Sequence, residues 1–161
     1  MKRSLFALIL GLAAAAPAAA WMLEIPMEDL VRTSDAVVRA HVVDRHSRWL
    51  EDPHIIVTDV TLDVRESWLG RIPPGTRITL QVHGGEVGDI GMREEHQPVF
   101  AADEDVVLFL TGAAGARLQV NSVEQGKYSV LDGEAVGSRM QRLSLASLKA
   151  TVNHLAPQGR R

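Results

Sequence analysis

The chain has 161 residues, no cysteine and a formal net charge of −3 at pH 7. This length predicts one domain with room for a hydrophobic core. The lack of cysteine excludes a disulfide framework, a thiolate metal site, a cysteine nucleophile and a lipid anchor on an N-terminal cysteine. Charges of both signs are scattered without a lysine or arginine cluster, which argues against nucleic acid and anionic lipid as partners.

Residues 1–20 have the pattern of a secretory signal peptide: two basic residues, a short apolar run, and alanines at 18–20 that fit the cleavage rule. We therefore expect the mature chain to begin at Trp21. No later stretch approaches eighteen uninterrupted apolar residues. The sequence predicts an exported product, periplasmic or extracellular, without a transmembrane segment in the mature chain. An uncleaved N-terminal anchor is the alternative.

The elements that follow are predicted in chain order. Residues 21–33 form a lead and a short helix, because Pro26 suits a first helical position and two acids follow it in the first turn. Residues 36–43 alternate as a strand with Val38, Ala40 and Val42 on one face. Residues 44–54 are polar and are interpreted as a loop or splayed hairpin.

Two long strands dominate the middle of the chain. Residues 55–68 and 77–83 alternate at period two, typical of a half-buried antiparallel sheet, and a Pro-Pro-Gly turn joins them. The first of them exceeds the usual strand length, so we expect a bend or a bulge. Trp68 has the parity of Leu62 and Val64 and is expected to close the end of a barrel.

Residues 84–103 are glycine-rich and lack a period, so this connection is either functional or hides an undetected element. Residues 106–110 are uninterruptedly apolar, which indicates a strand buried on both faces. Two further strands are predicted at 117–123 and 128–131. Ser144 can cap a helix over 145–155, whose stripe is Leu145, Leu148, Val152 and Leu155.

These elements predict a mainly β fold, a small antiparallel OB-like barrel of five or six strands with a short N-terminal helix and a C-terminal helix. The predicted organisation is a signal peptide (1–20), a lead and short helix (21–33), the β-barrel domain (34–132) and a linker, helix and frayed tail (133–161). A helix normally joins strands three and four of an OB barrel, whereas this chain has the glycine-rich connection there.

From about residue 34 to residue 130, the chain resembles a group of bacterial exported proteins. The resemblance is carried by Ser34-Asp35-Ala36-Val37-Val38-Arg39, Thr58 with Val60-Thr61, Gly84-Gly85-Glu86-Val87, the run at 106–110, and Gln125-Gly126-Lys127-Tyr128. It departs at Ala40, where the group often has glycine, and at Val57, where it often has an aromatic residue. The resemblance implies export and assigns no activity. In architecture the chain is also similar to netrin-like and metalloproteinase-inhibitor OB domains, but it lacks the cysteines on which their inhibition depends.

His83, Glu86 and Asp89 could together offer an imidazole and two carboxylates to a divalent ion. Their spacing matches no known motif, and a solvated strand end is the competing interpretation. A metal-dependent hydrolase would add the histidines of the first loop region to His83 and Glu86; these are His41, His46 and His54. Exposed loop residues are the alternative there.

A binding role fits the sequence better than catalysis, because function in barrels resides on the connections between strands. The candidate contact residues are Trp49 in the first polar region and Glu86 and Asp89 in the glycine-rich connection. Trp49 could equally fold over the barrel mouth. We therefore expect a non-enzymatic module without a cofactor that binds an extracytoplasmic protein or other ligand. A metal-dependent hydrolase and a structural component of an envelope assembly are the alternatives.

Overall fold

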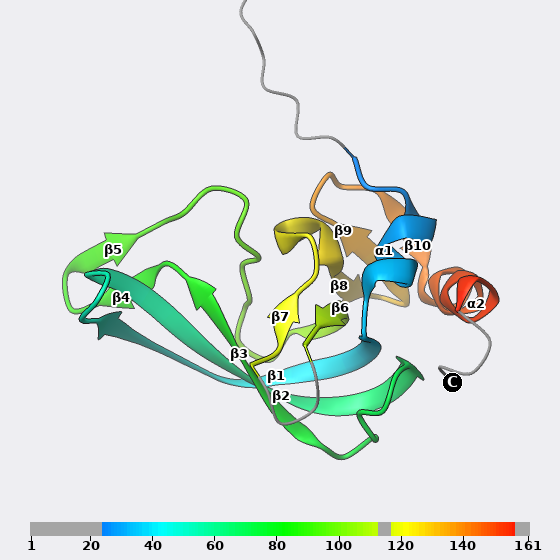
Figure 1. Ribbon diagram of the computed structural model, residues 1–161, viewed down its shortest axis with the longest axis horizontal. Coiled ribbons are helices and arrows are strands. Elements are labelled where there is room, and N and C mark those ends of the chain that lie inside the picture. Colours follow the sequence, from blue (N-terminus) through cyan, green and yellow to red (C-terminus); the bar gives the residue numbers. More distant parts are fainter. Residues whose placement is uncertain (1–23, 113–116, 157–161) are drawn as a thin grey trace, which may run out of the picture.

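The computed structural model describes residues 24–112 and 117–156. The predicted signal peptide and the start of the mature chain lie outside these residues. The described chain contains two α-helices, one 3₁₀ helix and ten strands (Figure 1). They are α1 (Met27–Thr33), β1 (Ala36–Leu50), β2 (Ile55–Leu69), β3 (Arg77–His83), β4 (Gly85–Val87), β5 (Ile90–Met92), β6 (Asp105–Thr111), β7 (Gln119–Val120), η1 (Val123–Gly126), β8 (Lys127–Leu131), β9 (Glu134–Gly137), β10 (Arg142–Ser144) and α2 (Leu145–Leu155).

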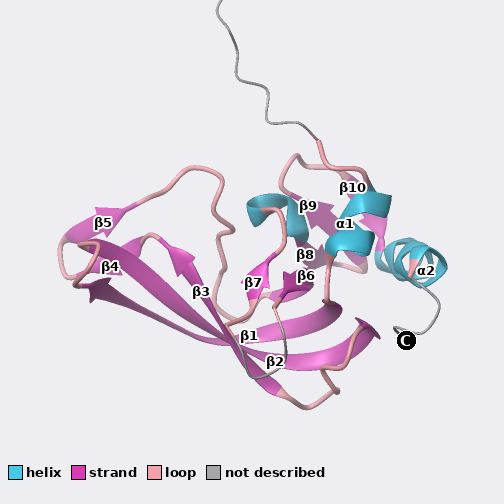
Figure 2. Cartoon of the chain, in the orientation of Figure 1, coloured by secondary structure: helices cyan, strands magenta, loops and turns pink. Residues whose placement is uncertain are grey.

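Eight strands form one antiparallel sheet in the order β10-β9-β8-β6-β1-β2-β3, with β7 also paired to β6. β4 and β5 form a separate two-stranded sheet. Both α-helices lie at one end of the molecule, and the opposite end is built only of strands and loops (Figure 2). The mainly β class with two helices is thus confirmed, whereas the ladder is an open path and has more strands than the five or six predicted.

Two hydrophobic cores share this sheet, one on each face. The first lies inside the curl of β1, β2, β3 and β6, and the second lies where α1 and α2 cover the outer face. β6 contributes alternate residues to both cores, so the prediction that residues 106–110 are buried on both faces is confirmed. The stripe of α2 is confirmed too, with Leu148 and Val152 fully buried and the helix capped by Ser144, which accepts a hydrogen bond from Ser147 N.

The expected irregularity of the second strand is confirmed by its register with β1. The register shifts between Val37 and Val38 and between Arg39 and Ala40, and each shift inserts one unpaired residue into β2. Arg65 and Trp68 are the inserted residues. Because an extra residue reverses the alternation, Trp68 packs in the second core and not with Leu62 and Val64. The prediction that Trp68 closes a barrel was therefore wrong.

Other segments differ from the prediction because their secondary structure depends on pairing with other strands, which the local sequence does not show. Residues 44–50 continue β1 and pair with β2 as far as the tight turn at 51–54, so the loop interpretation was wrong, and the hairpin that was its alternative is present with its strands paired. The connection at 84–103 contains the β4–β5 hairpin, an element that its polar, glycine-rich sequence concealed. The strand predicted at 117–123 is only the two-residue β7, which η1 follows. The predicted linker after residue 132 contains β9 and β10.

We predict that Leu108→Ala will lower the free energy of unfolding by about 2 to 5 kcal/mol, because Leu108 is fully buried in the first core. The matched change Thr79→Ala lies on the exposed face of β3 and should cost less than about 0.5 kcal/mol. Urea unfolding measures both values. Similar midpoints for the two variants would contradict the assignment of faces.

Candidate functional site

The end of the molecule away from the helices is an arm, which we define as residues 44–61 and 84–92. It comprises the second half of β1, the first half of β2 and the β4–β5 hairpin, which lies against them (Figure 1). β6 pairs with β1 only as far as His41, so beyond that point the sheet continues as β1, β2 and β3 alone. The arm therefore extends a rigid strand pair away from both helices.

The two glycines before β4 explain how its hairpin sits on the arm. Gly84 N donates to Ile56 O at 2.8 Å, and Thr58 Oγ1 donates to Gly84 O at 2.7 Å. A Cβ on Gly85 would lie 2.3 Å from Thr58 Oγ1 and 2.4 Å from Ser47 Oγ, distances that no side chain could occupy. Gly84 and Gly85 also have φ values of +94° and +139°. Glycine is thus required at both positions, by backbone conformation and by close approach.

Glu86 lies in the middle of β4 and Asp89 in the turn before β5, and both are exposed. Within residues 24–112 and 117–156 neither carboxylate has an ion-pair or hydrogen-bond partner. Ile90 follows at the start of β5 and is 54% exposed. The tip of the hairpin therefore combines unpaired negative charge with an exposed apolar side chain.

Trp49, the third predicted contact residue, lies near the end of β1 and is half-buried. Its ring stacks on that of His54 across the hairpin turn, with centroids 4.4 Å apart and planes 10° from parallel. It belongs to the arm together with Glu86 and Asp89.

The geometry gives no support to a metal centre at His83, Glu86 and Asp89. His83 Nδ1 lies 2.8 Å from Glu94 Oε2, a residue outside the predicted set. In the described part of the chain no group of three or more His, Asp or Glu side chains is arranged to hold an ion. The other histidines are dispersed, His41 beside Asp105, His54 on Trp49, and His46 opposite Asp59 in the ladder.

One arrangement of a hydroxyl, an amine and a carboxylate does exist away from the arm. Lys127 Nζ lies 2.7 Å from Glu104 Oε1 and 3.0 Å from Ser129 Oγ, and the lysine and glutamate side chains are only 10% and 13% exposed. Lys127 Nζ donates to both Glu104 and Ser129 Oγ, and Ser129 Oγ itself donates to Glu104, so the amine is not placed to accept the proton of the serine. Glu104 also accepts from Ala101 N, so this cluster fastens the chain before β6 to β8.

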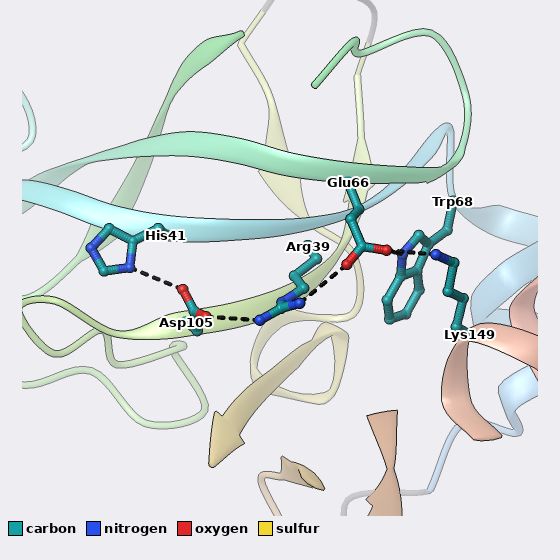
Figure 3. Close-up of polar contacts among 6 residues, drawn as sticks. All are labelled: Arg39, His41, Glu66, Trp68, Asp105 and Lys149. Carbon is teal, nitrogen blue, oxygen red and sulfur yellow. Dashed lines mark hydrogen bonds and ion pairs between the residues drawn. The ribbon is translucent and has the colours of Figure 1, made fainter. Parts of the chain in front are cut away.

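Sequence reasoning missed a chain of ion pairs on the outer face of the sheet, beside the second core (Figure 3). Asp105 on β6 binds both His41 Nδ1 at 2.9 Å and Arg39 Nη2 at 3.0 Å. Arg39 Nη1 then donates to Glu66 at 3.1 Å. The other oxygen of Glu66 accepts from Lys149 Nζ of α2 at 2.6 Å and from the indole N–H of Trp68 at 3.0 Å.

This ion-pair chain shifts the pKa of two carboxyls. Lys149, then Trp68 and Arg39, lower the pKa of Glu66 from 4.5 to about 2. Partial burial alone would raise the pKa of Asp105, but hydrogen bonds from His41 and Arg39 outweigh it and lower that pKa. These contacts join β1, β2 and β6 to α2, and their combined effect favours the ionised forms of Glu66 and Asp105.

The sequence gives one signal for these ion pairs, the polar side of β1, where Arg39 and His41 alternate with apolar residues. Their partners could not be identified because pairing depends on the register with β6 and on the bulges in β2.

No protein-family model, curated protein or solved structure matches the chain. Among the described residues, neither helix has the length and apolar character needed to cross a membrane.

We predict that Glu66→Gln will flatten the acid dependence of stability. Because folding depresses the pKa of Glu66, its contribution is complete above about pH 4.5 and is lost as the pH falls toward about 2. The side chain is 32% exposed, so solvent screening reduces the effect to on the order of 1 kcal/mol. Urea unfolding at pH 6 and pH 2.5 measures it.

The matched control is Glu134→Gln. Glu134 lies on β9 and forms an exposed ion pair with Arg142 of β10, so this variant should keep the pH dependence of the native chain. If the free energy of unfolding of Glu66→Gln falls between pH 6 and pH 2.5 as much as that of the native chain, the ion-pair chain does not stabilise the fold.

We also predict that Gly85→Ala will destabilise the protein by about 2 kcal/mol or more, through both the strained φ and the clash with Ser47 and Thr58. Gly88→Ala is the control in the same hairpin, because it has φ +61° but no atom within 4 Å of a new Cβ. It should cost only about 1 kcal/mol. Equal losses in denaturant unfolding would mean that the close approach is unimportant.

Proposed function

We propose that this chain is an exported, non-enzymatic binding module whose protein partner docks on the tip of the arm. The observation that carries the proposal is the glycine anchor. Gly84 and Gly85 fix the β4–β5 hairpin on the strands beneath it, while its tip presents Glu86, Asp89 and Ile90 without partners in the described chain. A preorganised surface loses less conformational entropy when it binds.

The charge of this surface defines the partner. Residues 84–95 carry four carboxylates against one arginine, and among the residues that the structure describes only Glu94 of the four has a partner, His83. A partner with a basic patch would be attracted and oriented by this field. Ile90 supplies the apolar centre that a protein interface needs, with Glu86 and Asp89 as its polar rim.

The curl of the sheet supports a partly closed, OB-like barrel as the scaffold of this module. An isolated parallel bridge joins Leu80 of β3 to Leu118, just before β7, so the β3 edge approaches the other side of the curl. The side chains of the first core fill the interior. Such a scaffold holds its connections rigidly, which suits a function carried by the arm.

The double variant Glu86→Ala/Asp89→Ala should weaken partner capture severalfold and change the free energy of unfolding by less than about 0.5 kcal/mol, because both side chains are solvated. Melting and pull-down from the cell envelope of the exporting host measure the two effects. If the bait recovered from the host has the intact mass of a chain that begins at Trp21, the same experiment establishes export. Unchanged capture by the folded double variant would rule out the arm tip as the docking surface.

A photo-crosslinking residue placed at position 90 tests whether the partner contacts the arm tip directly. Position 131 is the matched control, because Ile90 and Leu131 are 54% and 55% exposed. Crosslinks from position 90 alone support the proposal. The hydrolase alternative predicts instead that EDTA lowers the melting temperature of the native chain and not of the double variant. A structural component of an envelope assembly would crosslink from both positions.

A further inference from the structure

A shallow depression of about 440 Å³ lies beside the middle of β2, where the start of β3 pairs with it. Its lining consists of Asp63, Val64, Arg65, Gly75 and Arg77. This volume is in the range of sites for small ligands. The depression involves none of the arm residues, so a role for it is independent of the proposed partner surface.

Arg65 differs from the other arginines on the strands of the described chain. Each of those has an acceptor: Arg39, Arg48, Arg77 and Arg142 bind carboxylates, and Arg45 donates to Phe100 O. Arg65 is exposed and, in residues 24–112 and 117–156, has no ion-pair or hydrogen-bond partner. It is also the unpaired residue of a bulge, a distortion that re-aims a side chain.

The remaining polar groups leave the depression positively charged. Arg77 donates to both oxygens of Asp63, at 2.9 and 3.4 Å, and this bond, aided by the nearby charge of Arg65, lowers the pKa of Asp63. Two arginines against one aspartate leave one net positive charge. Asp63 thus fixes Arg77 at the rim, while the guanidinium of Arg65 keeps all its donors free for a ligand.

We propose that this depression binds an oxyanion, a carboxylate or phosphate group, with Arg65 as its principal donor and Arg77 as the second. The planar fork of a guanidinium matches two oxygens of such a group. Gly75 leaves the entrance open, because even a Cβ at this position would meet no atom within 4 Å.

The test is a titration of the purified chain with inorganic phosphate and, separately, with acetate, at constant ionic strength maintained with chloride. Backbone amide chemical shifts of Gly75, Thr76 and Arg77 should change saturably with at least one probe. Saturation by acetate alone assigns a carboxylate ligand, and saturation by phosphate alone assigns a phosphate.

Arg65→Gln should weaken the responding probe at least tenfold, and Arg65→Lys should weaken it severalfold, because lysine keeps the charge but loses the fork. Arg142→Gln, on β10, is the matched control and should bind as the native chain does. The proposal is overturned if neither probe saturates the shifts, or if Arg65→Gln binds within twofold of the native chain. Equal affinity in Arg65→Lys would overturn recognition by the guanidinium fork.

Discussion

The pairing of β1 with β2 is the interaction on which the rest of the structure depends. It extends from Val37 opposite Leu69 to Leu50 opposite Ile55, so it joins the helix-covered end of the molecule to the tip of the arm. Over its first half β1 also pairs with β6, and alternate side chains there enter both cores. Loss of this register would expose both cores at once, because a shift of one residue moves each side chain to the opposite face.

Local rules were enough to predict much of this fold. The alternation in β2 and β3, the continuous apolar run of β6 and the capped stripe of α2 follow from the spacing of apolar residues and from one serine. Each is a property of neighbouring residues, and the structure keeps these elements close to their expected bounds. The glycines at 84 and 85 stand out in the sequence, although the close approach to Ser47 and Thr58 that requires glycine at 85 was not visible there.

The remainder depended on contacts between distant residues. Residues 44–50 are too polar to indicate a strand, and their pairing comes from β2 and from the hairpin that lies on them. The bulge at Arg65 reverses, for Trp68, an alternation that the sequence alone extends unchanged. Likewise, the ion pair between Arg39 and Glu66 becomes part of a longer chain only because α2 places Lys149 beside Glu66. Trp49, Glu86 and Asp89 do lie on one arm, but the ion-pair chain and the depression at Arg65 were not foreseeable from spacing.

Ser144 ends β10 and caps α2 with the same residue, so the outermost strand passes directly into a helix. An edge strand of three residues, begun by an exposed arginine, offers few free backbone groups to a second sheet. At the other end of the sheet, β3 is approached by Leu118. A cysteine-free chain has no disulfide across its sheet, so at the β10 edge the shortness of the strand is what limits strand-to-strand aggregation.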